Sequence, residues 1–163
     1  MTTDDYQALE RQRDQLFDQA TLMMAAQDAN GAVEMGVTPF IRHDGAFFIF
    51  PSQLSRHVRA LLEQTHGQFM LIADESATAN QWARRRLKFN AKIEAVSRTS
   101  EEFVGLCDIF VERHGPTMEV IRDFTDFHML RLHPTDGVMV LGFAAAYALE
   151  GTALRVGDKL RSG

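Results

Sequence analysis

Two short groups of basic residues stand out in an acidic chain. One group is Arg84, Arg85, Arg86 and Lys88, and the other is Arg56, His57 and Arg59. The net charge of −5 argues against nucleic-acid binding, because neutralising many phosphates requires a basic surface. A locally basic pocket on an acidic protein suits one small anion better, and the guanidinium fork is a natural partner for phosphate or carboxylate.

Further candidate anion-binding groups lie where a strand is expected to end and a helix to begin. Pro51 follows an apolar segment, and the residues after it repeat at helical spacing, namely Leu54, Val58, Leu61 and Leu62. Ser52 is the expected N-cap of this helix. Its side chain and that of Gln53, together with the unpaired N–H groups of the first helical turn, can bind an anion.

The arginines of the first group adjoin the most regular strand pattern of the chain. From residue 86 to residue 96 apolar and polar residues alternate, which is typical of a half-buried strand. By the period of two, Arg84 and Arg86 share one face. Arg85 points the other way and is expected at the surface.

The remaining pattern predicts a mainly β, α+β protein. We expect a helix at residues 4–19 that leans on the sheet, then strands at 21–27, 32–41, 46–50, 69–73, 86–96, 127–132 and 138–144. Helices are expected at 52–62, 99–115 and 117–123, and residues 134–137 are expected as a turn between the last two strands. Many strands joined by tight turns favour an antiparallel barrel over a parallel α/β layer.

Length and composition bound the class of protein. With 163 residues we expect one domain, consisting of the N-terminal helix, a barrel at about 20–150 and a short C-terminal tail. The longest apolar runs fall short of the roughly 20 residues that cross a bilayer, and Cys107 is the only cysteine. We therefore expect a cytoplasmic protein with no membrane or nucleic-acid partner and no structural zinc.

Three strings, in this order and spacing, resemble a known family. They are residues 50–57 (FPSQLSRH), residues 83–89 (ARRRLKF), and residues 126–134 (DFHMLRLHP) followed by Gly142-Phe143. Over roughly residues 20–150 the chain resembles the bacterial haem-iron-utilisation family. That family has the FMN-binding split β-barrel fold of the pyridoxamine 5′-phosphate oxidase-like superfamily.

The resemblance implies a homodimer with a planar anionic ligand, haem or FMN, in the cleft between subunits. The ligand-binding residues that it implies are Ser52, Gln53, Arg56, His57, Arg84 and Arg86, which would hold a flavin phosphate or a haem propionate. Asp126 matches the family carboxylate, whose expected role is to hydrogen-bond the histidine that ligates iron.

The iron ligand is the point at which the sequence departs from the family. Haem-ligating members take this histidine from a C-terminal loop, whereas residues 151–163 contain none. His128 and His133, which lie within the third string, remain as candidate ligands.

Three functions therefore stay open. The first is a haem-utilisation protein, with oxidative haem breakdown as its enzymatic form. The second is an FMN-dependent oxidoreductase, although a dedicated pyridoxamine-phosphate oxidase is disfavoured because residues 139–143 (MVLGF) replace the Phe-Trp-Gln-Gly tract of those enzymes. The third is a non-catalytic carrier with the same fold, because a fold does not determine a function.

Overall fold

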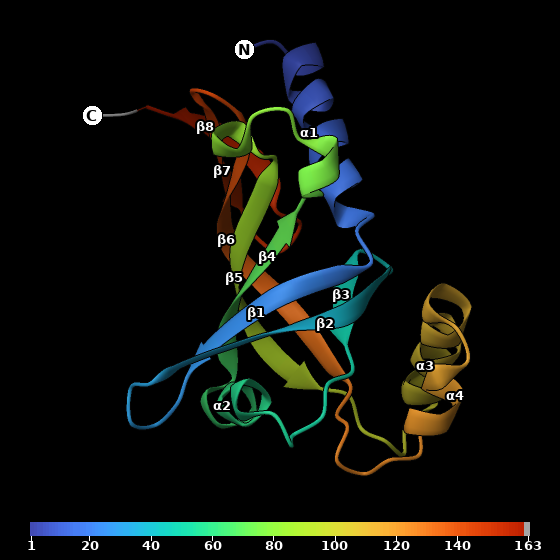
Figure 1. Ribbon diagram of the computed structural model, residues 1–163. Coiled ribbons are helices and arrows are strands. Elements are labelled where there is room, and N and C mark those ends of the chain that lie inside the picture. Colours follow the sequence, from blue (N-terminus) through green and yellow to red (C-terminus); the bar gives the residue numbers. More distant parts are fainter. Residues whose placement is uncertain (162–163) are drawn as a thin grey trace.

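The computed structural model, which describes residues 1–161, shows a single antiparallel sheet that closes on itself (Figure 1). The strand order is β3-β2-β1-β4-β5-β6-β7-β8, and β3 also pairs with β6. The strands are β1 (Thr21–Gln27), β2 (Val33–His43), β3 (Ala46–Ile49), β4 (His66–Ile72), β5 (Arg86–Ala95), β6 (Leu130–Gly142), β7 (Ala145–Glu150) and β8 (Arg155–Leu160). Strands β1 to β6 thus form the barrel, while β7 and β8 extend the sheet beyond it. The expected mainly β, split-barrel fold is confirmed.

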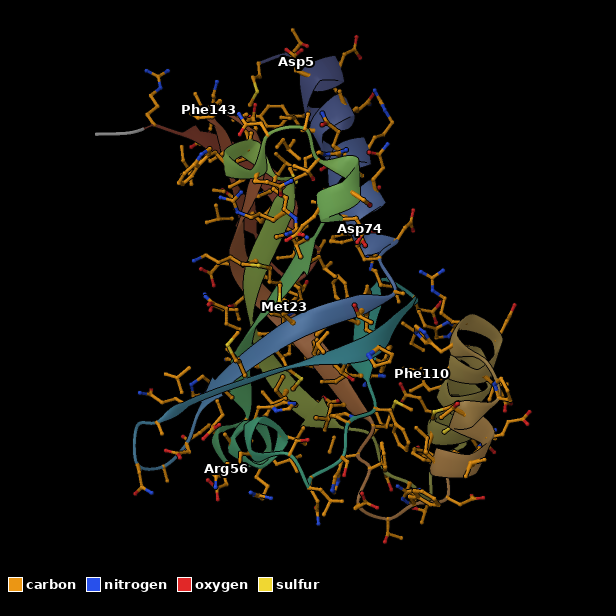
Figure 2. All side chains as sticks on the ribbon, viewed as in Figure 1. Asp5, Met23, Arg56, Asp74, Phe110 and Phe143 are labelled. Atoms are coloured by element: carbon orange, nitrogen blue, oxygen red, sulfur yellow. The ribbon has the colours of Figure 1, made fainter. Side chains whose placement is uncertain are left out.

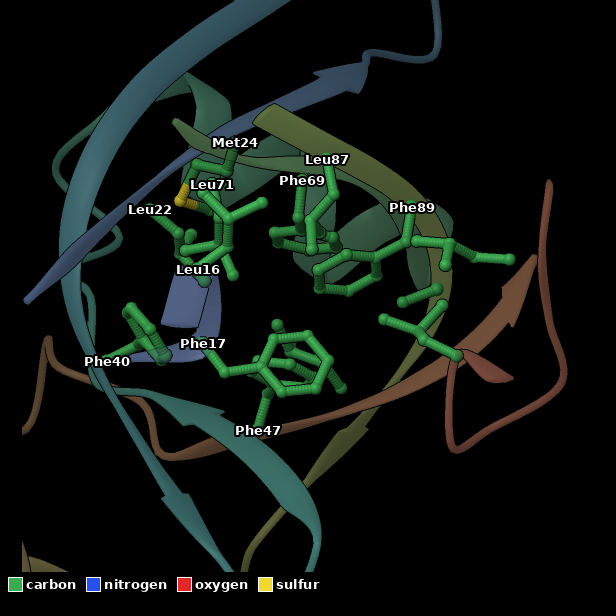
Figure 3. Packing of buried hydrophobic residues seen from close by; sticks show 14 of the residues in the cluster. Leu16, Phe17, Leu22, Met24, Phe40, Phe47, Phe69, Leu71, Leu87 and Phe89 are labelled. Atoms are coloured by element: carbon green, nitrogen blue, oxygen red, sulfur yellow. The ribbon is translucent and has the colours of Figure 1, made fainter. Parts of the chain in front are cut away.

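The barrel interior is filled by aromatic and branched side chains (Figure 3). On β5, Leu87, Phe89 and Ala91 are buried, as their alternation predicts. The ring of Phe89 stacks on that of Phe47 at 5.1 Å between centroids and on that of Phe69 at 5.5 Å. Since these rings come from β3, β4 and β5, their packing ties opposite walls of the barrel together.

Helix α1 (Thr3–Phe17) packs against the barrel as expected, through buried Leu9, Leu16 and Phe17. The structure corrects one expectation here. Arg85 is not a free surface residue, because its Nη2 donates to Gln15 Oε1 at 2.9 Å and its Nε is buried without a partner. The side chain fastens α1 to the start of β5.

Helix α2 (Arg56–Gln64) covers one end of the barrel but begins later than expected. Its N-cap is Ser55, not Ser52, and Leu54 is 77% exposed and so lies outside the apolar stripe. The reason is that Ser52 remains extended and forms an isolated β-bridge with Phe127. Spacing alone does not reveal this bridge, because the two residues are far apart in the sequence.

Helices α3 (Glu101–His114) and α4 (Thr117–Ile121) cover an outer side of the barrel with a second apolar cluster. Ser100 caps α3 by accepting the N–H of Phe103. Cys107 lies in this cluster with no exposed surface, and burial raises the pKa of its thiol. It is therefore a packing residue.

Two expectations for the C-terminal third are wrong. Residues 134–137 are not a turn, because β6 runs through them as one strand, with a bulge where Thr135 has no partner on β5. The Thr135 hydroxyl lies 2.8 Å from Asp136 Oδ1 and 3.3 Å from the Asn90 carbonyl, both of which can accept its proton. The stretch after residue 150, expected as a tail, contains β8, which pairs with β7.

No helix within residues 1–161 is both long and apolar enough to cross a membrane.

Candidate functional site

Two segments that are distant in the sequence lie side by side below α3 and α4. Besides the bridge from Ser52 to Phe127, the N–H of Gln53 donates to the Asp126 carbonyl at 2.8 Å. The N–H of His128 donates to the Pro51 carbonyl at 3.0 Å. These backbone contacts align the two segments and bring their polar side chains together.

The side chains form two direct pairs. The Ser52 hydroxyl donates to Asp126 Oδ2 at 2.6 Å, and His128 Nε2 lies 2.7 Å from Gln53 Oε1. Because an amide oxygen only accepts, Nε2 is the donor in this arrangement, and Nδ1 is the ring nitrogen not bonded to Gln53. The sequence placed Ser52, Gln53 and Asp126 in one site, and the structure brings them together with His128.

An apolar pocket of about 450 Å³ adjoins this polar cluster. Its walls come from the edge of β2, the segment after β3, the first turn of α2, and helices α3 and α4. The lining residues are Val37, Thr38, Pro39, Phe50, Pro51, Ser52, Ser55, His57, Val58, Phe110, His114, Thr117, Met118, Ile121 and Phe127. The pocket is within the size range of ligand sites, and Ser52 joins it to Asp126.

The contribution of α3 and α4 to this pocket was not predicted. Their residues Phe110, His114 and Met118 follow ordinary core spacing in the sequence. Only the fold shows that they face Ser52 across a hollow. His114 is held by a 2.7 Å hydrogen bond between its Nε2 and the Phe40 carbonyl.

His57 lies on the wall of the pocket, against the backbone of β2. A β carbon placed on Gly36 would lie 2.2 Å from His57 Cε1, so the glycine makes room for the imidazole. Burial lowers the pKa of His57, and the charge of Glu34 opposes this effect only in part. The ring is therefore predominantly neutral at pH 7.

The other basic residues of α2 differ in what they contact. Arg56 is exposed at the first turn. Arg59 donates from Nη1 to the carbonyls of Gln53 and Leu54, both at 3.1 Å, and so holds the loop that presents Gln53. Both residues line a separate pocket that also contains the acidic residues Asp28, Glu34 and Glu63.

Arg84 and Arg86 lie at the other end of the barrel within the same chain. Arg86 begins β5 opposite Val140, whereas Ala95 ends β5 opposite Leu130, close to the Asp126 segment. At about 3.3 Å per residue, the length of β5 separates these ends by roughly 30 Å. Figure 2 shows Arg56 at one end of the molecule and Phe143, which directly follows β6, at the other.

Both arginines also make contacts within their own loop. That loop contains the short 3₁₀ turns η1 (Glu75–Ala77) and η2 (Gln81–Ala83). Arg84 Nε donates to the Ala73 carbonyl at 2.5 Å, and Arg86 Nη1 donates to the Arg84 carbonyl at 2.7 Å. Within one chain, therefore, the arginines and Ser52 do not form a single site.

The second candidate iron ligand, His133, lies apart from the polar cluster. Its Nε2 is 3.4 Å from Glu94 Oε2. Arg131 also binds Glu94, and its hydrogen bond holds the pKa of that carboxyl below its usual value. Over residues 1–161 there is no cluster of three or more histidine, cysteine or acidic side chains arranged to hold a metal ion.

Comparison with known proteins identifies the family. Residues 8–158 match the family described as pyridoxamine 5′-phosphate oxidase. The chain belongs to this family. The match covers most of the barrel, the polar cluster and the pocket, so the resemblance seen in the sequence is confirmed.

One relative of the chain is named for haem. The chain is 32% identical over 137 residues to the protein named heme oxygenase HutZ of Vibrio cholerae, covering 84% of this chain and 78% of the relative. A crystal structure of HutZ, described as a heme storage protein, superposes with a TM-score of 0.77 at 28% identity, covering 83% of this chain and 97% of that one.

Campylobacter jejuni ChuZ shares the fold with a TM-score of 0.82 at 24% identity, covering 96% of this chain and 66% of that one.

Proposed function

We propose that this chain is a haem-utilisation protein that binds haem beside the Ser52–Asp126 pair. The observation that supports the proposal best is the placement of this pair at the edge of an apolar pocket of about 450 Å³. Haem combines a flat apolar macrocycle with two carboxylates, so its site needs both kinds of surface. The relationship to HutZ supports the same ligand.

The residues present fit such a ligand. Phe50, Phe110 and Phe127 supply apolar wall, while the backbone N–H groups in the first turn of α2 supply donors for a carboxylate. The Ser55 side chain makes no capping hydrogen bond, so its hydroxyl is available as well. Asp126 is a positioned acceptor suited to hydrogen-bond an imidazole and strengthen it as an iron ligand. Bound haem would supply the redox chemistry.

The iron ligand is part of the proposal. His128 is the better placed of the two histidines suggested by the sequence, because it lies in the cluster with Asp126 and its Nδ1 is the ring nitrogen not bonded to Gln53. His133 is bound instead to the Glu94 and Arg131 network.

We further propose that the working unit is a cytoplasmic homodimer. The outward face of β2 exposes three alternating apolar residues, Val33 at 71%, Met35 at 68% and Val37 at 64%. Met23 is the cross-strand neighbour of Val37, which widens this surface onto β1. A second copy covering it would remove the apolar area from water and would let the partner's Arg84 and Arg86 reach the cleft that contains Ser52.

Haem binding and oxidative haem breakdown are separate activities. HutZ is named as an oxygenase in one description and as a storage protein in another. Oxidative breakdown of haem by this chain would require O₂ and an external electron donor. Storage or transfer would require only the site.

FMN is the second candidate ligand, and the first turn of α2 favours it. Backbone N–H groups at a helix start, with Ser55 and Arg56, suit a flavin phosphate. The family that matches the chain is also named for a flavin-type oxidase activity. In this case the apolar pocket would contact the flavin ring, and the protein would be an FMN-dependent oxidoreductase.

Titration with haemin and, separately, with FMN distinguishes these functions. We expect haemin to give a sharpened Soret band that weakens in Asp126→Asn and Ser52→Ala. Asp123→Asn serves as a matched control. It removes a carboxylate from the segment between α4 and β6 that also carries Asp126, but it leaves the hydrogen-bond partner of Ser52 in place. Retained yellow colour and quenched flavin fluorescence would support the alternative instead. If the protein responds to neither compound, the haem proposal is refuted and the non-catalytic carrier is favoured.

A further inference from the structure

One arginine outside the recognised strings contacts the segment that carries Asp126. Arg98 follows β5, and its guanidinium donates to three backbone carbonyls. Nη1 lies 2.6 Å from the Arg122 oxygen, and Nη2 lies 2.9 Å from the Phe124 oxygen and 2.7 Å from the Phe127 oxygen.

These acceptors flank Asp126 in the sequence. The N–H of Phe127 donates to the Phe124 carbonyl at 3.2 Å, which closes a turn with Asp126 as its third residue. Nη2 of Arg98 therefore binds the carbonyls at the first and last positions of that turn. Nη1 binds the end of α4, just before the turn. These hydrogen bonds hold the backbone of the turn and so set the direction in which the Asp126 side chain projects from it.

The position of the guanidinium is itself fixed by aromatic rings. Its central carbon lies 4.9 Å from the ring centroid of Phe103 and 6.0 Å from that of Phe50. The ring of Phe50 in turn stacks on that of Phe127 at 5.4 Å. Arg98 thus connects the start of α3 and the end of β3 to the turn that carries Asp126.

We propose that Arg98 is a positioning residue that holds the Asp126 turn against Ser52 and Gln53. A guanidinium offers five donors in a rigid plane and reaches three carbonyls at once, whereas a lysine ammonium is a single compact centre on a flexible chain. Arginine is therefore required here for its shape as well as its charge. The inference concerns the site of the proposed function, but it does not depend on which ligand occupies that site.

The test compares Arg98→Lys and Arg98→Met with Arg113→Met in the unliganded protein. Arg113 is a matched control, because its Nη2 also binds backbone carbonyls, those of Asp18 and Gln19, away from the site. The readouts are the hydrogen-exchange rate of the Gln53 amide, which donates to Asp126, and the NMR signals of the His128 ring. Thermal unfolding is measured on each variant.

We expect about tenfold faster exchange at Gln53 and shifted His128 signals in both Arg98 variants, including Arg98→Lys, which retains the charge. Arg113→Met should leave both site signals unchanged even where its unfolding temperature falls. If Arg98→Met does not fold, the Gln53 exchange rate and the His128 signals of Arg98→Lys test the inference. Native exchange at Gln53 and native His128 signals in a folded Arg98 variant would overturn the inference. Failure of haemin to bind the native protein would refute the proposed function and leave this result standing.

Discussion

The imidazole of His57 occupies the space in front of Gly36 where any other residue would project its β carbon. This contact joins α2 to β2 at the wall of the pocket, and it shows why a small residue is needed in the middle of a strand.

Replacing Gly36 by alanine should therefore displace His57. The added carbon would lie 2.2 to 2.7 Å from three ring atoms, so the side chain must rotate or α2 must shift. We expect lower stability, by about 1 to 3 kcal/mol, and weaker ligand binding at the pocket. Urea unfolding and the His57 ring signals in NMR spectra measure the two effects.

Gly105→Ala provides the control for that substitution. Gly105 lies within α3 and a β carbon there would meet no atom within 4 Å. Alanine should stabilise the helix by about 0.5 to 1 kcal/mol. Equal effects of the two substitutions would contradict the steric argument for Gly36.

The stability of the protein should depend on pH through His57. Burial lowers the pKa of His57 below its ordinary value of 6.5, so the native state binds fewer protons than the unfolded chain just below that pH. The stability that the neutral His57 ring contributes is fully present above about pH 6.5 and is lost as pH falls toward the folded-state pKa of His57. The midpoint of urea unfolding should decrease between pH 7.5 and 5.5 more steeply for the native protein than for His57→Gln. Parallel pH profiles for the two proteins would rule out this linkage.

The apolar face of β2 gives a test of the proposed dimer. Met35→Glu places a charge in the centre of the exposed apolar strip and should convert a dimer to a monomer in sedimentation equilibrium, because burying that charge is unfavourable. Val120→Glu, at a 61% exposed position on α4, should leave the assembly unchanged. A native protein that sediments as a monomer would remove the basis for a cleft shared between subunits.

Much of the fold could be predicted from local pattern. The alternation on β5 and the helical spacing of Val58 and Leu61 on α2 both depend on neighbours in the sequence. The errors concern residues whose conformation depends on distant partners. Pro134 to Gly137 read as a turn, but pairing with β5 on one side and β7 on the other keeps this stretch extended.

The residue types of the candidate site follow from the resemblance, whereas their geometry follows only from the fold. Ser52, Gln53 and Asp126 were identified through resemblance, and their contacts are now visible. No sequence pattern marked Arg98 as part of the site, because its partners are backbone carbonyls, which any residue type offers. The role of Arg84 and Arg86 stays a prediction, since it requires a second subunit.

Closure of the barrel between β3 and β6 also has a kinetic consequence. Phe47 pairs with Leu132, so the last seam of the barrel joins strands from opposite halves of the chain. During synthesis the first half emerges with β3 lacking this neighbour, and it stays exposed to wrong pairings until β6 has left the ribosome. Folding should therefore be slow for a chain of this length, and the rate-limiting step should be the formation of that seam.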